Sequence, residues 1–214
     1  YEYLGSAHSI SIPVTLRDSL MARLDRVMPV KEVAQIGAAI GREFSYELIE
    51  AIAPMSKAQL HDALARLTES GLAFRRGTPP DALYTFKHAL VQDVAYDSLL
   101  KSKRARLHTQ IANVIEEQFP ATKETEPELL AYHFTQAGQF GQAIPLWKTA
   151  GQLATKRMAL QEAVAHLKKG LELVQTLSPS TERDTREVEI RTALGVAIMA
   201  LYGWAHPEVR VSFE

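Results

Sequence analysis

The chain has 214 residues, of which 46% are hydrophobic, and its formal net charge is −1. This composition excludes a disordered tail, and the balanced charge excludes a general attraction to nucleic acid. Cysteine is absent, which excludes disulfides, thiolate nucleophiles and cysteine-ligated zinc. Because no apolar run approaches the roughly 20 residues that span a bilayer, we expect a cytoplasmic protein of one or two domains.

The chain starts without a pattern and then becomes helical. Residues 1–14 lack hydrophobic periodicity, so we predict a linker from an upstream domain that is missing from this sequence. Leu20 and Leu24 stand at helical spacing and predict a helix that begins after Thr15. A second helix is expected over 30–40, where small residues would let another element approach closely.

Two further helices carry recognisable start and stop signals. Ser45 begins a short helix, and the next helix is expected over 57–70. Ser56 and Gln59 form a capping box at its start, and Gly71 ends it.

The next stretch is the best β-hairpin candidate of the sequence. Two short apolar, aromatic-rich runs, 72–76 and 82–86, are separated by the turn sequence GTPPD. Helices followed by a hairpin are the order of a winged helix. We therefore predict a winged-helix-like domain over 15–118, which includes a trailing helix that resumes at His88, falters near Ser102 and continues to Gln118.

The remainder reads as short helices separated by breaks. Pro120 and its polar neighbours predict a linker over 119–125. Helical segments then follow over 126–214, a region that we expect to continue beyond the last residue of this sequence. The expected fold class is therefore mainly α: a winged-helix-like bundle with one β-hairpin, followed by antiparallel helical hairpins.

A repeat pattern appears within 126–214. Tetratricopeptide repeats of about 34 residues place small residues where two helices cross and large residues between repeats. Seven residues fit these spacings on two successive helices: Trp147, Ala150, Gly151, Ala154, Ala163, Leu167 and Gly170. Tyr132 and Phe134, with Trp147, are the predicted core of the first hairpins. Any other amphipathic helical hairpin remains an alternative.

The sequence lacks the patterns typical of catalytic or metal sites. The seven histidines never fall within one helical turn of each other, and no phosphate-binding loop or hydrolase motif is present. We therefore expect no catalytic residues, no metal and no cofactor in this chain, which we predict not to be an enzyme.

Binding of DNA by the winged helix is an alternative function. The helix over 57–70 would enter the major groove, but Lys57 and Arg66 are balanced there by Asp62 and Glu69. Positive charge is concentrated elsewhere in the chain. The candidates for an interdomain or basic patch are Arg75, Arg76, Lys101, Lys103, Arg104 and Arg106. A solvated helix face would also explain the last four.

Several stretches together resemble one protein family. GREFSYELIEAI, TFKHALVQDVAYDSLLKSKRARLHTQIA, AYHFTQAGQFGQAIPLWKTAGQLA and HLKKGLELV resemble the region behind the nucleotide-binding domain of bacterial STAND-type signalling ATPases. The likeness covers nearly the whole chain from Ile12 onward. It is greatest to multidomain proteins that combine such an ATPase with an adenylate/guanylate cyclase domain and tetratricopeptide repeats.

The resemblance implies a regulatory role rather than a reaction. In this family the winged helix helps to hold the ATPase in its ADP-bound form, and the repeats receive a protein or small-molecule inducer. ATP, ADP and Mg²⁺ would bind only in the upstream domains. Relatives place a winged-helix histidine against the β-phosphate of ADP, and His88 is the candidate here, although its neighbours Lys87 and Ala89 depart from the usual Met-His-Asp motif.

Three functions therefore remain open. The first is a regulatory region that contacts its own ATPase domain and controls a linked cyclase. The second is the sensor region of a transcriptional activator of similar build. The third is a DNA-binding winged helix. None of them involves a membrane.

Overall fold

The structure, a computed structural model, describes residues 14–25, 28–204, 207 and 209. The predicted linker 1–14 lies outside the described residues except for Val14, which begins the first helix. The expected mainly α fold is confirmed, with one small antiparallel sheet. The chain divides into two compact units between Leu100 and Lys101, and each unit is described separately.

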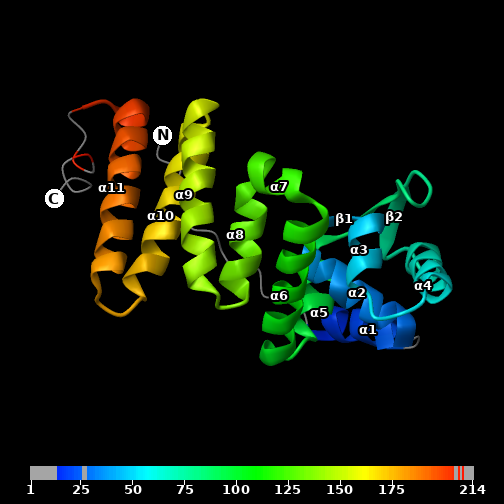
Figure 1. Ribbon diagram of the computed structural model, residues 1–214. Coiled ribbons are helices and arrows are strands. Elements are labelled where there is room, and N and C mark those ends of the chain that lie inside the picture. The colour runs from blue at the N-terminus through cyan, green and yellow to red at the C-terminus, as the bar shows by residue number, and fades with distance from the viewer. Residues whose placement is uncertain (1–13, 26–27, 205–206, 208, 210–214) are drawn as a thin grey trace. The chain divides into compact units, whose positions relative to one another are not determined.

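The first unit contains five helices and three strands among its described residues (Figure 1). In chain order they are α1 (Val14–Asp25), α2 (Met28–Ile40), β1 (Glu43–Ser45), α3 (Tyr46–Ile52), α4 (Lys57–Glu69), β2 (Ala73–Arg76), β3 (Leu83–Phe86) and α5 (Ala89–Asp97).

Local signals set several of these boundaries as expected. The Ser45 side chain accepts a hydrogen bond from the Leu48 amide at the start of α3. The Ser56–Gln59 capping box is present in full at the start of α4. Gly71 follows α4 with a φ of +69°, a left-handed conformation that glycine adopts without strain.

The sheet contains one strand more than the predicted hairpin. The strand order is β1-β3-β2, and both pairings are antiparallel. β2 and β3 form the expected hairpin, whereas β1 pairs with β3 through Glu43 opposite Thr85. One face of this sheet supplies the aromatic core of the unit, in which Phe44 stacks on Tyr84 with ring centroids 5.7 Å apart.

The core of the first unit depends on a close approach between β1 and α2. A Cβ atom on Gly37 would lie 2.5 Å from the Phe44 ring, so the ring packs directly on the α2 backbone. Val33, Ala34 and Ile40 of α2 are also buried, and α2 packs on α4 and α5. Only glycine gives Phe44 this space.

The second unit is a series of antiparallel helices. They are α6 (Lys101–Gln118), α7 (Pro120–Thr125), α8 (Pro127–Gln136), α9 (Phe140–Lys156), α10 (Leu160–Gln175) and α11 (Thr181–Tyr202). Each of α8 to α11 packs on its neighbours in sequence, and α6 packs on α7 and α8, as Figure 1 shows.

Three local expectations need correction. The segment predicted as a linker, 119–125, contains the short helix α7, whose first residue is Pro120; no α7 residue is buried, so the helix has no apolar periodicity to reveal it. The break predicted near Ser102 lies earlier, at Ser98–Leu100, because α6 begins at Lys101. Tyr132, predicted as core, is 40% exposed, whereas Phe134 and Trp147 are buried.

Candidate functional site

The described residues contain no group of three or more side chains that could hold a metal ion. Of the seven histidines, His8 and His206 lie outside the described residues. The candidate sites among the described residues are exposed surfaces, two pockets and one buried pair of rings.

His88 lies at the junction of β3 and α5. It is the N-cap residue of α5, its side chain is exposed, and it makes no side-chain capping bond. The first turn of α5 contains no acidic residue. The imidazole and the positive end of the helix dipole thus lie together at the surface, an arrangement that favours an anion.

An exposed aromatic ring and two cations lie on β2, and a third cation, Lys87, directly precedes His88. Phe74 on β2 is 58% exposed, and the Lys87 ammonium lies 5.6 Å from its ring centroid. Arg75 and Arg76 follow on the same strand and are exposed. We call the exposed residues Phe74, Arg75, Arg76, Lys87 and His88 the wing surface, in which Arg75 lies on the sheet face opposite to that of Phe74 and Arg76.

Acidic groups flank the wing surface. Glu47, Arg76 and Asp81 line an open pocket of about 320 Å³ beside the hairpin turn. Arg75 lies beside the phenol of Tyr84, whose pKa is raised, because burial outweighs the lowering effect of that guanidinium. This mixture of charges suits a protein surface better than the uniformly negative backbone of a nucleic acid.

The two cations of α4, the helix that would enter the major groove of DNA, are paired with carboxylates. Lys57 at the start of α4 pairs with Glu50 at 3.1 Å, and Arg66 pairs with Asp62 at 3.0 Å. Any contact with phosphate would have to displace these carboxylates. The structure therefore offers α4 no unpaired lysine or arginine among the residues it describes.

The remaining predicted cations lie on the first turns of α6, in the second unit. Lys101, Lys103 and Arg106 are exposed, and Arg104 is half-buried. This part of α6 contains no acidic residue. Four cations at the positive end of a helix dipole oppose helix formation locally, so an anionic partner would relieve their repulsion.

The seven predicted repeat residues all lie buried in the α9–α10 hairpin. A Cβ atom on Gly151 would lie 2.4 Å from Cγ of Leu167, so the two helices cross there at close range. A Cβ atom on Gly170 would meet Trp147 at 3.2 Å and Ile190 of α11 at 3.3 Å. Small residues therefore set both the α9–α10 and the α10–α11 crossings.

A small pocket opens on the surface shared by α9 and α11. It holds about 90 Å³, and its lining includes the apolar residues Ile144 and Ile190 and the charged residues Lys148, Arg186 and Glu189. Lys148 Nζ lies 2.7 Å from a Glu189 carboxylate oxygen. This hydrogen bond, more than the charge of Lys148 itself, lowers the pKa of Glu189.

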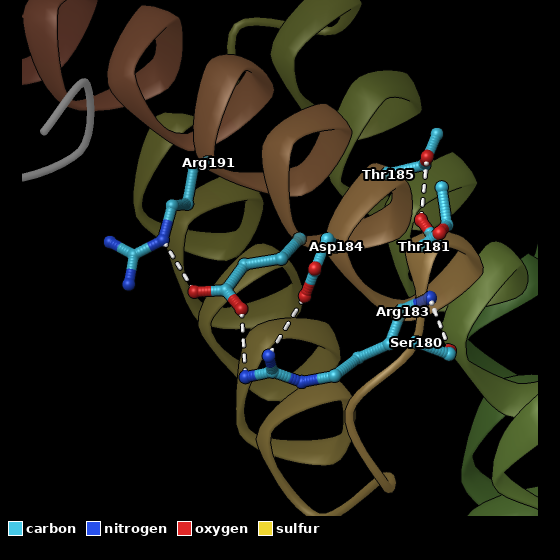
Figure 2. A network of polar contacts seen from close by, with 7 residues as sticks. Ser180, Thr181, Arg183, Asp184, Thr185 and Arg191 are labelled. Carbon is cyan, nitrogen blue, oxygen red and sulfur yellow. Dashed lines mark hydrogen bonds and ion pairs between the residues drawn. The ribbon is translucent and has the colours of Figure 1, made fainter.

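A ladder of ion pairs fixes the start of α11, as Figure 2 shows. Ser180 caps the helix by accepting a hydrogen bond from the Arg183 amide. Glu187 accepts from Arg183 at 3.0 Å and from Arg191 at 2.9 Å, one helical turn on either side. The pairs stiffen the helix that forms one wall of the α9–α11 pocket.

The structure brings together one pair of residues that the sequence does not indicate. His108 on α6 and His133 on α8 are both completely buried, and their Nδ1 atoms lie 2.8 Å apart. Spacing along one helix cannot reveal a contact between two helices. The only available signal was that each histidine stands on the apolar face of its helix, His108 beside Ile111 and Ile115, and His133 beside Leu130.

The described helices include none that is both long and apolar enough to cross a membrane. No protein-family model matches the chain, and no solved structure matches it. The chain is similar to an uncharacterized protein of Rhizobium meliloti (strain 1021), with 28% identity over 196 residues. The match covers 91% of this chain but only 19% of that relative, so this chain spans about a fifth of the relative's length.

Proposed function

We propose that this chain is a non-catalytic regulatory region of a multidomain bacterial signalling ATPase located in the cytoplasm. Its first unit restrains the nucleotide-binding domain, and its helical hairpins receive a protein or small-molecule inducer that controls a linked adenylate/guanylate cyclase. The main support is the α9–α10 hairpin, where residues at tetratricopeptide spacings are buried at close helix crossings. Such stacked hairpins present extended surfaces that suit partner binding.

The wing surface is the proposed contact with the ATPase domain. Its exposed aromatic ring and its exposed cations have the composition of a protein interface. His88, at the uncapped start of α5, is the proposed contact to ADP bound in that domain. ATP, ADP and Mg²⁺ belong to the upstream domains in this proposal.

The restraint can be tested by mixing this chain with the separately produced ATPase domain of the longer protein. We expect slower ATP hydrolysis and amide protection within 75–106. The double variant Arg75→Glu/Arg76→Glu should abolish both effects because it reverses two charges at the interface. Its matched control, Lys57→Glu/Arg66→Glu, reverses two charges on α4 and should retain both; equal loss in the two variants contradicts the proposal.

The role of His88 has a separate readout. Replacing His88 by Ala should speed ADP release from the mixture without abolishing association, because only one donor to phosphate is lost. His61→Ala, an exposed histidine on α4, provides the control. Unchanged ADP release in His88→Ala removes the nucleotide role but leaves the restraint intact.

The two alternatives make different predictions. A sensor region of a transcriptional activator requires a helix-turn-helix output domain in the parent protein instead of a cyclase. Direct DNA binding predicts a gel shift that weakens steeply between about 50 and 200 mM salt. The paired cations of α4 disfavour this second alternative, and we expect no shift at either salt concentration.

A further inference from the structure

The small sheet of the first unit ends in β2. The strand order is β1-β3-β2, so β2 is an edge strand of the sheet that the described residues form. The Lys87 amide donates to the Leu72 carbonyl at 3.0 Å, and hydrogen-bonded pairs alternate along an antiparallel ladder. Phe74 therefore exchanges hydrogen bonds with β3, whereas Ala73 and Arg75 direct their amide and carbonyl groups away from β3. We call this side of β2 the free edge.

The bonds on the other side of β3 agree with this register. Phe86 lies opposite Ala73, and its amide donates to the Arg42 carbonyl, just before β1, at 3.0 Å. The Phe86 amide therefore bonds the β1 side and not β2. Ala73 is only 2% exposed, so a partner reaches the free edge at Arg75, which is exposed.

The side chains around this edge are aromatic and cationic. Phe74 is 58% exposed and shares one face of the sheet with Arg76, while Arg75 lies on the other face. The sequence of β2, AFRR, contains no acidic residue. The carboxylates of Glu47 and Asp81 lie farther along, around the pocket at the hairpin turn. A second copy of this chain, paired along the same edge, would bring its own arginines beside these, which disfavours self-pairing.

We propose that β2 binds an extended acidic segment of a partner protein, which adds to the sheet as a further strand at Arg75. The backbone of Arg75 bonds the segment whatever its sequence. Side chains select the segment: an apolar residue opposite Phe74 covers the exposed ring, and acidic residues opposite Arg75 and Arg76 pair with the guanidinium groups. This mode of binding rests on the proposed function for its partner, the ATPase domain that the wing surface contacts.

The exchange of single amides with water tests this addition on the unmodified chain. The probe is a blocked peptide containing valine–glutamate–glutamate–valine, which can place a valine opposite Phe74 and glutamates opposite both arginines in either strand direction. At about 1 mM peptide, a concentration that suits weak binding by a short segment, NMR should show exchange of the Arg75 amide slowed by about twofold or more. The Phe74 amide, already bonded to β3, should change little. A peptide with lysine in place of glutamate should slow neither amide.

Two outcomes of this titration overturn the proposal. The first is unchanged exchange of the Arg75 amide with the glutamate peptide. The second is equal slowing at Arg75 and Phe74, because an added strand bonds only alternate residues of its neighbour.

A matched pair of variants carries the test to the partner. Arg75→Pro removes the outward amide but no hydrogen bond to β3, a change that an edge strand tolerates. Arg75→Ala removes the same guanidinium and keeps the amide. Mixed with the separately produced ATPase domain, Arg75→Pro should associate about tenfold more weakly than Arg75→Ala, because a carbonyl of the added segment loses its donor. Circular dichroism and thermal unfolding show whether both variants fold, and the peptide titration needs neither of them.

The outcomes separate strand addition from the proposed function. Equal association of the two variants overturns strand addition, whereas the restraint stands if Arg75→Glu/Arg76→Glu abolishes it. If the unmodified chain neither binds the ATPase domain nor slows ATP hydrolysis, the proposed function is contradicted. The exchange of the Arg75 amide with the glutamate peptide then still decides whether the free edge accepts an acidic strand.

Discussion

In the first unit one aromatic ring occupies the space above a glycine, whereas in the second unit glycines recur along successive helix crossings. Phe44 packs on Gly37 and on the rings of Tyr84 and Phe86. Gly151 and Gly170 receive Leu167 and Trp147 in the α9–α10 hairpin. The first arrangement concentrates packing at one long-range contact, and the second distributes it among neighbours in sequence.

The difference has a consequence for stability. The β1 strand that carries Phe44 pairs with β3 about forty residues further along the chain, as in Glu43 with Thr85. Loss of this contact removes support from α2 and from the sheet together. Loss of one helix–helix contact in the second unit removes support from two helices, but the other neighbours of those helices remain in place. We therefore expect changes in the first unit to spread further than changes in the second.

The largest effect is expected for Phe44→Ala. Removing a fully buried ring should lower the free energy of unfolding by about 3–5 kcal/mol. Hydrogen exchange should show lost protection in α2, β1 and β3. Both tryptophans of the chain lie in the second unit, so tryptophan fluorescence during urea unfolding provides the internal control and should change little. A loss confined to β1 contradicts the idea of one concentrated contact.

Gly151→Ala should have the next largest effect. The new methyl group overlaps Leu167, and overpacking costs about 1–3 kcal/mol, of which the better helix propensity of alanine returns up to about 1 kcal/mol. Lost protection should be confined to α9 and α10. Urea unfolding followed by tryptophan fluorescence measures the change in stability.

Two further variants test whether the overlap is the cause. Leu167→Ala alone destabilises by about 2–5 kcal/mol, but combined with Gly151→Ala it should cost less than the sum of the two. Gly141→Ala changes a glycine of α9 that has open space around it and should be neutral or stabilising. Strict additivity of the first pair would falsify the close-crossing account.

Helix caps should give smaller and more equal effects in the two units. Ser56→Ala removes the capping box of α4, and Ser180→Ala removes the cap of α11. Each should cost about 1 kcal/mol, because a cap acts within one helical turn and not on the core. Thermal or urea unfolding monitored by circular dichroism measures both. A large difference between the two would show that caps, too, depend on the unit around them.

Much of the fold could be predicted because it depends on local signals. The Ser45 and Ser56 caps, the Gly71 stop and the hairpin turn each act over a few residues, and all lie where the sequence places them. The α9–α10 hairpin also follows from spacing, because the helices are adjacent in sequence. These are the features for which the chain's local and tertiary preferences agree.

What could not be predicted depends on distant contacts. β1, which pairs with β3, has only three residues. This length is too short to show the alternation of apolar and polar side chains by which a strand is recognised in a sequence. The His108–His133 pair joins two helices, so neither spacing nor composition indicates it. Tyr132 looks apolar in the sequence, but it lies at the edge of this pair with part of its ring in solvent.

The smallest effect tests the surface shared by α9 and α11, where the second unit joins helices that are not adjacent in sequence. Lys148→Met should raise the pKa of Glu189 towards its ordinary value, because the hydrogen bond from Lys148 is the main cause of its lowering. The ion pair stabilises the fold at neutral pH and is lost as pH falls through the pKa of Glu189. NMR titration of the carboxyl carbon measures the shift. The control Arg186→Met removes a weaker influence on the same carboxylate and should raise the pKa of Glu189 less. A larger shift in that variant would mean that Arg186 of α11, and not Lys148 of α9, is the main cause of the lowered pKa.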